Sequence, residues 1–491
     1  MKKRILRLLL IIILVSTPMV AQAADKKGYS FDGYTYDFWW NAIESPAAFQ
    51  VDQVLDGNSM GGNGLLSVND VCTSLDGRIF LADTLSNRVN IVDQNGNFIK
   101  SLKVIRDSND KIVVDQDTGK QMILNAPEGV FYHEKENELY IANTGAENII
   151  ILDGSDYTMK RLIKKPDNMT GVTQFKPSKL TVDNTGRMYV VVQSSYEGII
   201  ELNSDGTFSR YFGVNKPRVN LMDYFWKSVS SDQQKQQMKK TFAPAFNNVA
   251  IDGDGFVYAV TYDKAAEFMA FRLNSGGKNV LREQGDTPVI GDVHGRFSNP
   301  SEFVDIAVTD YGTYAVADKS RGRIFIYDYD GQLLNTFGSI GNTKGSYNNP
   351  TGIAWLGNRL VVSDSGLKCV YILKPTVFGE TALLASKEYY NGQWDAALKD
   401  FEKILKINSN YEIAYIGIGK NYLMKDEYKK AMYYFKQGNN RIFYSKAYNG
   451  YRAEVLQKHF SIVAALFLVF ITAVIASEVK YHKKEGRRGE K

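Results

Sequence analysis

Val68-Asn-Asp-Val-Cys-Thr-Ser-Leu-Asp-Gly-Arg-Ile-Phe-Leu-Ala-Asp83 is the stretch of sequence that decides the fold. It holds a short apolar segment, a polar turn with glycine, and a second apolar segment that ends in Ala-Asp. Pro127-Glu-Gly-Val-Phe-Tyr-His-Glu-Lys-Glu-Asn-Glu-Leu-Tyr-Ile-Ala-Asn143 repeats this pattern, and about six copies lie between Val68 and Leu373. A repeat of roughly 40–50 residues that contains several strands predicts a β-propeller, in which each repeat forms one blade.

The repeats can be aligned on their second strands. We predict that these strands end near Asp83, Asn143, Gln193, Thr261, Asp318 and Asp364. The last repeat lacks an outer strand, because Lys374-Pro375 is expected to end the sheet after Leu373. The strand-like residues 49–55, ahead of the first repeat, are expected to complete the sixth blade and to leave no free sheet edge. Residues 34–373 are therefore predicted to form an all-β, six-bladed propeller.

The loops after the second strands carry a resemblance to a known family. Ala82-Asp-Thr-Leu-Ser-Asn-Arg-Val89, Ala142-Asn-Thr-Gly-Ala-Glu-Asn-Ile149 and Ala317-Asp-Lys-Ser-Arg-Gly-Arg-Ile324 resemble the recurrent Ala-Asp-x-x-Asn-x-Arg-Val of NHL-repeat propellers. The fourth repeat, Val260-Thr-Tyr-Asp-Lys264, departs furthest from that pattern. The resemblance implies a six-bladed propeller and says little about activity.

After residue 376 the pattern becomes helical. Trp394, Ala397 and Phe401 are followed thirty-four residues later by Tyr428, Ala431 and Phe435, a spacing that resembles tetratricopeptide repeats. The resemblance implies an all-α segment of two such repeats at 376–440, followed by a capping or linker helix at 441–459. Two repeats suit a rigid stalk or a peptide-binding groove.

Both ends of the chain predict a membrane topology. Residues 1–23 read as a signal peptide, with basic residues, an apolar stretch and Ala21-Gln22-Ala23 for cleavage. Residues 460–477 are apolar and long enough for one transmembrane helix, and the basic residues of 478–491 suit a cytoplasmic tail. We therefore expect a single-pass protein of the bacterial cytoplasmic membrane whose N-terminal domains lie outside the cytoplasm.

Charge and cysteine content exclude some functions. The net charge is +5, and much of it lies in the signal peptide and the tail, so nucleic acid is not an expected partner. Cys72 and Cys369 fall in the first and last repeats, which become neighbours when the ring closes. A disulfide is conceivable, but two buried thiols are the preferred interpretation.

The predicted ligand-binding residues surround one mouth of the propeller channel. Loops that lead into the inner strands place Asn69, Glu128, Ser178, Asn247 and Thr351 there, with Asp83, Asn143, Gln193, Thr261, Asp318 and Asp364 one step outward. Oxygen-rich rings suit a hard cation such as Ca²⁺ or a polyol, and Glu128, Asn247 and Asp318 are the first metal candidates. The alternative is that these side chains satisfy loop amides and bind water.

Long insertions at 103–123, 213–243 and 283–299 are expected on the same face. In the middle one, Tyr224 and Trp226 either contact a sugar or protein partner or hold the loop against the propeller. A second aromatic cluster at residues 34–40 is expected to pack the seam of the ring.

Several propeller enzymes are similar in fold, among them gluconolactonases, virginiamycin-type lyases and the peptidylglycine amidating lyase. The last two need histidines, and this chain has four, namely His133, His294, His459 and His482. His133 is expected in a turn on the opposite face from the predicted ring, so a histidine-based lyase is disfavoured. The sequence shows no Gly-x-Ser-x-Gly, phosphate-loop or Cys-x-x-Cys motif either.

Three hypotheses of function remain, and in one of them the helical repeats recruit a partner close to the membrane while the propeller serves as a cap. The leading one is a non-catalytic binding or scaffold module, anchored in the membrane by one C-terminal helix, for a glycan, a peptide or an envelope or transport partner. The alternative is a metal-dependent hydrolase, similar to a lactonase, that uses the oxygens of the channel mouth.

Overall fold

The computed structural model describes residues 33–59, 64–169, 171–193, 195, 197–213, 244–263, 266, 268–281, 289, 291–292 and 301–486. The predicted signal peptide lies outside these residues. The chain divides into two compact units. One contains Glu44–Thr376 with the chain up to Tyr34, and the other contains Thr35–Ile43 with Val377–Lys491.

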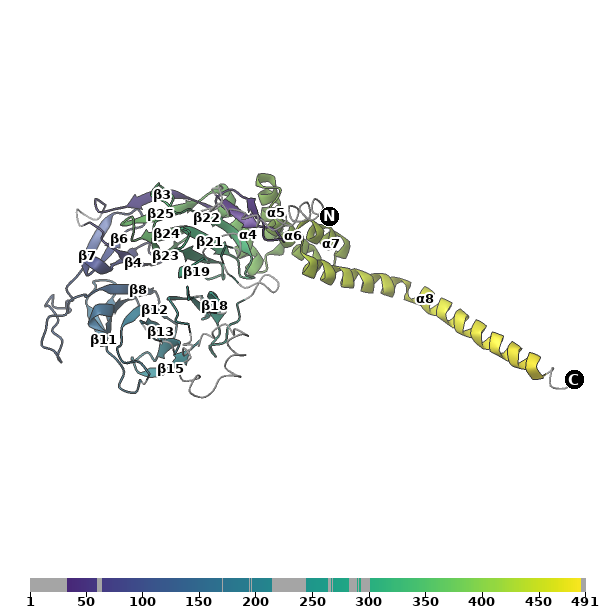
Figure 1. Cartoon of the computed structure of the whole chain (residues 1–491), viewed down its shortest axis with the longest axis horizontal. Helices are drawn as coiled ribbons and strands as arrows, with labels where there is room; N and C mark the ends of the chain where they lie inside the picture. Colours follow the sequence, from purple (N-terminus) through teal and green to yellow (C-terminus); the bar gives the residue numbers. More distant parts are fainter. Residues whose placement is uncertain are drawn as a thin grey trace, which may run out of the picture. The chain divides into compact units, whose positions relative to one another are not determined.

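The first unit is built from six antiparallel sheets among the described residues. Blade one consists of β4 (Val68–Thr73), β5 (Ile79–Asp83), β6 (Arg88–Val92) and β7 (Phe98–Leu102). Blade two consists of β8 (Pro127–His133), β9 (Glu138–Asn143), β10 (Asn148–Asp153) and β11 (Met159–Ile163). Blade three consists of β12 (Pro177–Val182), β13 (Met188–Val192), β14 (Ile199–Leu202) and β15 (Phe208–Phe212). Blade four consists of β16 (Asn248–Ile251), β17 (Val257–Val260) and β18 (Ala270–Leu273). Blade five consists of β19 (Phe303–Val308), β20 (Tyr314–Asp318), β21 (Arg323–Tyr327) and β22 (Leu333–Phe337). Blade six consists of β23 (Pro350–Leu356), β24 (Arg359–Asp364), β25 (Cys369–Pro375) and β3 (Phe49–Leu55). Figure 1 shows the sheets arranged around a common centre, with inner strands such as β8, β12 and β19 nearest to it.

The ring closes through β3, as predicted. β3 pairs antiparallel with β25, with Leu55 opposite Val370 and Val51 opposite Leu373. Each inner strand lies beside the next, in the cyclic order β4, β8, β12, β16, β19 and β23, and β23 returns to β4. The predicted six-bladed propeller is therefore confirmed.

The sheet of blade six runs further than expected. Lys374 and Pro375 continue β25 opposite Gln50 and Phe49, so the prediction that the sheet ends after Leu373 is wrong. Proline fits there because the pairing of β25 with β24 ends at Leu373, and a missing N–H is tolerated where a strand has one neighbour.

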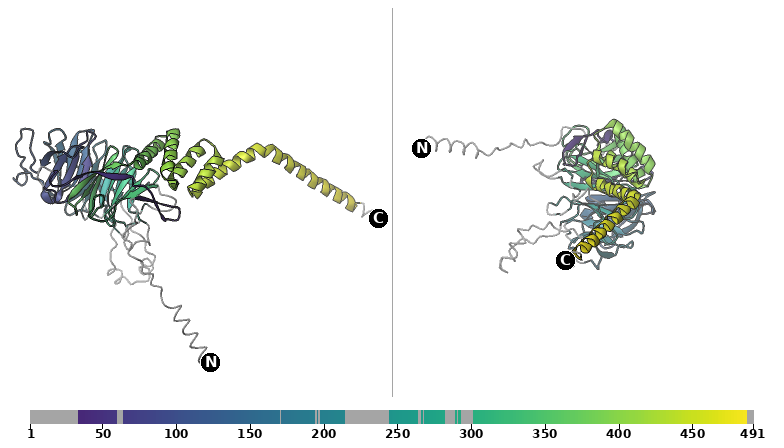
Figure 2. Two further views of the ribbon diagram at one scale, coloured as in Figure 1. Left: turned by 90° about the horizontal axis from the view of Figure 1, so that it is seen from above. Right: turned by 90° about the vertical axis from the view of Figure 1, so that its right-hand side faces the viewer.

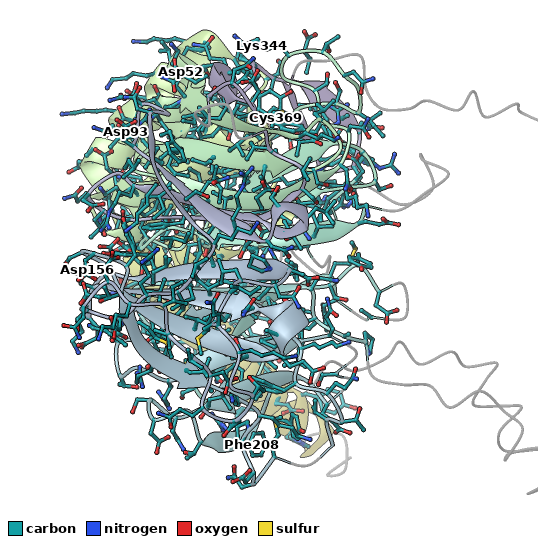
Figure 3. All side chains as sticks on the ribbon, turned by 90° about the vertical axis from the view of Figure 1, so that its left-hand side faces the viewer. Asp52, Asp93, Asp156, Phe208, Lys344 and Cys369 are labelled. Carbon is teal, nitrogen blue, oxygen red and sulfur yellow. The ribbon has the colours of Figure 1, made fainter. Side chains whose placement is uncertain are left out.

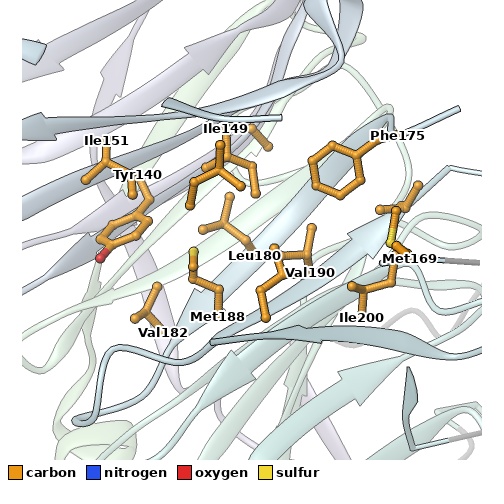
Figure 4. Packing of buried hydrophobic residues seen from close by; sticks show 14 of the residues in the cluster. Tyr140, Ile149, Ile151, Met169, Phe175, Leu180, Val182, Met188, Val190 and Ile200 are labelled. Carbon is orange, nitrogen blue, oxygen red and sulfur yellow. The ribbon is translucent and has the colours of Figure 1, made fainter. Parts of the chain in front are cut away.

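The core lies between the blades, because each sheet packs against its neighbour on both faces. Figure 4 shows one such layer, in which Tyr140, Ile149 and Ile151 of blade two lie against Leu180 and Met188 of blade three. All of these side chains are buried. A strand that is covered on both faces reads as a continuous apolar run, which explains sequences such as Ile79-Phe-Leu-Ala-Asp83.

Both cysteines are free thiols in the described part of the chain. Cys369 is buried and Cys72 is half-buried. The structure therefore supports the preferred interpretation of two separate thiols over a bridge across the seam.

The second unit contains five helices in the described region after the propeller. They are α4 (Val377–Tyr390), α5 (Trp394–Ile407), α6 (Glu412–Met424), α7 (Tyr428–Gln437) and α8 (Arg441–Gly486). Glycines allow close packing of α5, α6 and α7: a Cβ on Gly417 would collide with the ring of Phe401, and one on Gly419 would lie 2.6 Å from the ring of Phe435. Helices α4 to α7 occupy the segment expected to be helical.

Helix α8 is one continuous helix. It runs through both the predicted linker at 441–459 and the predicted membrane span at 460–477, and it is drawn as one ribbon in Figure 2. Its segment Arg441–His482 is long and apolar enough to cross a membrane.

The aromatic cluster at residues 34–40 does not pack the seam as a single plug. Tyr34 is buried in the propeller, where β1 (Gly33–Tyr36) pairs with β22 of blade five and is followed by β2 (Ala42–Glu44). Residues 35–43 belong to the second unit, where the Phe38 ring lies 5.0 Å from the guanidinium of Arg441. The seam is filled by Phe49, whose ring centroid lies 5.4 Å from that of Phe337 and 6.1 Å from that of Trp355.

Candidate functional site

A β-bulge occurs at the same place in five inner strands. The register shifts lie at Val68/Asp70, Pro127/Gly129, Pro177/Lys179, Phe303/Asp305 and Pro350/Gly352. A bulge adds one residue to a strand and turns the side chain beside it in a new direction. The third residue of each of these strands follows the bulge: Asp70, Gly129, Lys179, Asp305 and Gly352. Together with Asn248 of blade four, these third positions bring a set of buried polar groups and glycines toward the axis of the ring.

Asp70 and Lys179 are the centre of this axial group. Their carboxylate and ammonium form an ion pair of 2.7 Å, and each residue is at most 8% exposed. Lys179 also donates to the backbone oxygen of Asn69, at 2.7 Å, and Asp70 accepts from the backbone N–H of Val130, at 2.9 Å. Blades one, two and three are thereby joined at the axis.

Glycines make room for this contact. A Cβ on Gly129 of blade two would lie 3.0 Å from the Cα of Lys179 and would collide with the backbone oxygen of Ser178. A Cβ on Gly352 of blade six would lie 3.2 Å from the Cα of Asp70. Blades two and six therefore carry no side chain at the third position, which leaves space for the long side chain of Lys179.

Asp305 supplies a second buried carboxyl group to the axis. It accepts hydrogen bonds from the backbone N–H of Ile306 at 2.7 Å and of Ile353 at 2.6 Å, and from the side-chain amide of Asn248. Burial raises the pKa of Asp305 well above its usual range, and the positive charge of Lys179 opposes that rise. The pKa of Asp70 is raised by burial too, again against Lys179. The axis is thus a closed polar network.

The residues predicted at the channel mouth are all half-buried. Each comes one position before an axial residue in the sequence. Glu128 accepts a hydrogen bond of 2.7 Å from Gln193, and burial raises the pKa of its carboxyl group. The others bond within the protein: Asn69 with Ser67, Ser178 with the oxygen of Val191, Asn247 with the N–H of Tyr262, and Thr351 with the oxygen of Val68. Their role in ligand binding stays a prediction.

The outer ring holds loops in place. Asp83, Asn143, Thr261, Asp318 and Asp364 are fully buried, and Gln193 is exposed. The buried side chains bond to the loop that leads into the inner strand of their own blade: Asp83 accepts from Leu66 and Ser67, Asn143 from Asn125, Asp318 from Glu302, and Asp364 from Asn348 and Asn349, whereas Thr261 donates to Ala245. The two loops thus lie on one face, as predicted, and these oxygens satisfy loop amides.

The three predicted metal candidates bond to different partners. Glu128 bonds with Gln193, Asn247 with Tyr262, and Asp318 with the N–H groups of Glu302 and Ser320. Across the described residues, no group of three or more His, Cys, Asp or Glu side chains is arranged to hold a metal ion.

Of the predicted insertions, 103–123 is described and forms a narrow arm. Bridges pair Val104 with Ile123, Arg106 with Ile112, and Val114 with Gln121. Tyr224 and Trp226 lie outside the described residues, as do most of residues 283–299. The proposed contact of these aromatic residues with a partner therefore stays a prediction.

The opposite mouth of the channel opens into a cavity of about 740 Å³. We call it the turn-side cavity, because its wall includes the turns between first and second strands, and all six blades line it. Asp93 and Asp156, in turns between third and fourth strands, lie together on one side of the ring in Figure 3. The C-terminal parts of the inner strands contribute Thr73, Phe131, Val182, Ile251 and Trp355 to its wall.

His133 lines this cavity, which confirms that it lies on the face opposite the predicted ring. The residue is 4% exposed, and neither ring nitrogen has a hydrogen-bond partner among the described residues. Burial lowers the pKa of its imidazole, which favours the neutral form of the ring. Sequence reasoning missed this cavity, because the only signal was the place of His133 beside a turn.

Comparison with known proteins gives no family. No protein-family model matches the sequence, and no curated protein matches it. Similar solved structures include hydrazine synthase of Kuenenia stuttgartiensis, with 12% identity over 64% of this chain and 96% of that chain and a TM-score of 0.39. Virginiamycin B lyase from Staphylococcus aureus has 12% identity over 66% of this chain and 99% of that chain, also with a TM-score of 0.39. At these scores the likeness carries no functional argument, and the fold rests on the strand pairing described above.

Proposed function

We propose that this chain is a membrane-anchored binding or scaffold module on the outer side of the bacterial cytoplasmic membrane. The observation that carries the proposal is the turn-side cavity of about 740 Å³, which receives residues from every blade. Its volume lies within the range of small-molecule sites. Asp70, Lys179 and Asp305 are buried at the axis of the same ring, which favours a cavity that holds a ligand over an open passage.

The anchor is proposed from the surface of α8. Its apolar side chains are exposed in water, among them Phe460, Leu466 and Phe470, which are 64% to 69% exposed. Transfer of such a surface into lipid is favourable. The basic residues at 478–491 and the signal-like residues 1–23 support an orientation with the propeller outside the cytoplasm.

Membrane extraction and protease accessibility test the anchor and its orientation. In cells that produce the full chain, alkaline carbonate should leave the protein in the membrane pellet, and protease added to spheroplasts should remove the propeller. A chain that ends at residue 459 should be released. Release of the full chain by carbonate, or protection of the propeller in spheroplasts, would reject this part of the proposal.

Binding is tested with the full chain in lipid nanodiscs. Fractionated envelope glycans and envelope proteins are passed over the immobilised protein, and retained material is eluted and titrated against fresh protein. A ligand that saturates at one per chain supports the binding function. If no fraction shows saturable binding, the function as a binding module is wrong, even if the anchor is confirmed.

We call the channel mouth predicted around Asn69, Glu128, Ser178, Asn247 and Thr351 the loop-side mouth. A second candidate function is a metal-dependent hydrolase at this mouth. It is favoured by the half-buried carboxyl group of Glu128, whose pKa is raised by burial and which lies beside Gln193. Addition of Ca²⁺ or Zn²⁺ should then raise the melting temperature, and Glu128→Gln should abolish the increase. An equal melting temperature with and without these ions argues against the enzyme.

A further inference from the structure

We propose that the turn-side cavity binds a neutral saccharide and that His133 makes hydrogen bonds with its hydroxyl groups. The inference rests on the proposed function, because it names the ligand class and the site of the binding module. It places the ligand on the face opposite the oxygen-rich ring that the sequence indicates.

The imidazole of His133 is unsatisfied within the described protein. A neutral imidazole has one N–H donor and one acceptor nitrogen, and both are buried without a partner in the described protein. Buried polar groups are almost always hydrogen-bonded. A hydroxyl group both donates and accepts, so a sugar hydroxyl can pair with either the N–H or the acceptor nitrogen of the imidazole.

The position of His133 is fixed by the sheet. It is the last residue of β8 and lies opposite Glu138 in the pairing with β9. Its ring also contacts the edge of the Tyr140 ring, with 6.5 Å between centroids and an angle of 88°. A ligand would therefore meet a histidine that is already oriented, which lowers the entropic cost of binding.

Two aromatic residues lie on the wall of the cavity. Phe131 and Trp355 line it and are both half-buried, so part of each ring stays accessible. The indole of Trp355 is held by a hydrogen bond of 3.1 Å to the backbone oxygen of Ala307. Aromatic rings in fixed positions offer an apolar face, with which the C–H face of a sugar can pack.

Charged groups on the wall are nearly balanced. Glu134, Asp252 and Asp310 face Lys135 and Arg359, and Asp252 is already paired with Arg272 at 3.1 Å, so neither an anion nor a cation is favoured overall. Three of the other groups also bond with the protein: Glu134 accepts from the N–H of Leu75, Lys135 donates to the oxygen of Asn184, and Arg359 donates to the oxygen of Gln94.

Amide side chains complete the wall. Gln94, Asn184 and Asn358 line the cavity and are exposed to solvent. An amide group offers both donors and acceptors, which match pairs of sugar hydroxyls without requiring a charge on the ligand. A neutral polyhydroxylated ligand therefore fits the cavity better than an acidic peptide or a phosphate.

The experiment uses the full chain in lipid nanodiscs and isothermal titration with four probes. Maltotetraose, cellotetraose and chitotetraose are neutral, and tetragalacturonate is the acidic comparison. At least one neutral probe should bind, and tetragalacturonate should bind at least ten-fold more weakly. His133→Phe, which keeps a ring but removes both nitrogens, should weaken binding at least ten-fold without lowering the melting temperature.

A second readout separates contact from a structural role. In protein labelled with ¹⁵N-histidine, the bound probe should shift the two nitrogen resonances that His133→Phe removes, and Trp355→Leu should reduce the affinity as well. Binding that is unchanged in His133→Phe, or nitrogen resonances that do not move, would show that the imidazole bonds with water alone and would overturn the proposed site.

Other outcomes separate the inference from the function on which it rests. If Glu128→Gln abolishes binding and His133→Phe does not, the ligand lies at the loop-side mouth, and the binding function stands. If tetragalacturonate binds best or no neutral probe binds, the ligand class is wrong. Saturable retention of an envelope protein would then still support a binding module, and its absence would reject both.

Discussion

Asp70 and Lys179 form a buried ion pair of 2.7 Å although they lie in blades one and three, which are not neighbours in the ring. The contact is possible because blade two has Gly129 at the corresponding place, where a Cβ would lie 3.0 Å from the Cα of Lys179. A sheet pairing holds strands within one blade, whereas this ion pair acts between blades. It is therefore expected to stabilise the closed ring.

Replacement of Lys179 by methionine should destabilise the propeller strongly. The change would leave Asp70 and Asp305 buried without their shared positive charge, and loss of one partner of a buried ion pair costs about 3–5 kcal/mol. The shift in the urea midpoint of the full chain in detergent measures the effect. Lys164→Met is the matched control, because Lys164 forms a pair of 2.9 Å with Asp115 at the surface. Exposed pairs contribute about 0–1 kcal/mol, so similar losses in both variants would contradict a special role for the axial pair.

Gly129→Ala should also destabilise the ring. Its Cβ would collide with the backbone oxygen of Ser178, which belongs to a strand and cannot move freely. Overpacking of this kind costs about 1–3 kcal/mol. Gly64→Ala is the control, because a Cβ there would have no atom within 4 Å. Differential scanning calorimetry compares the two, and an equal melting temperature would show that blade two yields at the axis.

The buried aspartates of the outer ring should matter for stability. Asp364 accepts from the N–H groups of Asn348 at 2.6 Å, Asn349 at 3.1 Å and Leu367 at 2.9 Å. Asp364→Ala leaves these donors without their acceptor, with an expected loss of about 2 kcal/mol or more in unfolding free energy. Gln193→Ala changes the exposed residue at the same place of the repeat and should cost less than about 0.5 kcal/mol. Chemical unfolding of both variants checks the difference, and an equal loss would contradict the loop-holding role.

The contribution of Asp318 to stability should fall as the pH rises from about 4 to 7. Burial raises the pKa of Asp318 to about 7, and the pKa of an unfolded aspartate is about 3.9. Between these values the folded state keeps a proton that the unfolded state has released, so unfolding becomes more favourable with increasing pH. The slope for this group is about 1 kcal/mol per pH unit. Melting temperatures measured from pH 5 to 8 should fall less steeply in Asp318→Asn than in the unchanged chain. Parallel curves for the two proteins would refute the assignment to Asp318.

Disruption of β3 should open the ring. Gln53 lies opposite Ile372 in the middle of the closing pair, and proline at that position removes a donor and distorts the strand. Gln53→Pro should lower the melting temperature of the propeller by more than Ile99→Pro, which changes the outer strand of blade one. The reason is that β7 joins no chain ends, whereas β3 connects the beginning of the propeller to its last blade. If Ile99→Pro is the more harmful change, closure by β3 is not what stabilises the ring.

The sequence predicts the ends of the second strands and misses the residues at the axis. Strand ends at Asp83, Asn143, Asp318 and Asp364 were predicted to the residue, because strand and turn are local patterns. The axial residues were not found, because a bulge moves the register by one position: the sequence indicates Asn69 and Ser178, and the structure brings Asp70 and Lys179 together. A pattern of alternating residues does not reveal such an insertion.

By itself, the sequence determined the number of blades, the strand that closes them and the change to helices after residue 376. Each of these depends on periodicity, which is a property of neighbouring residues. Only the tertiary structure decided that Asp70 contacts Lys179 across blade two and that His133 lines the turn-side cavity. Both arise where all the blades converge, and the distances there follow from the geometry of the closed ring and not from the pattern of any single repeat.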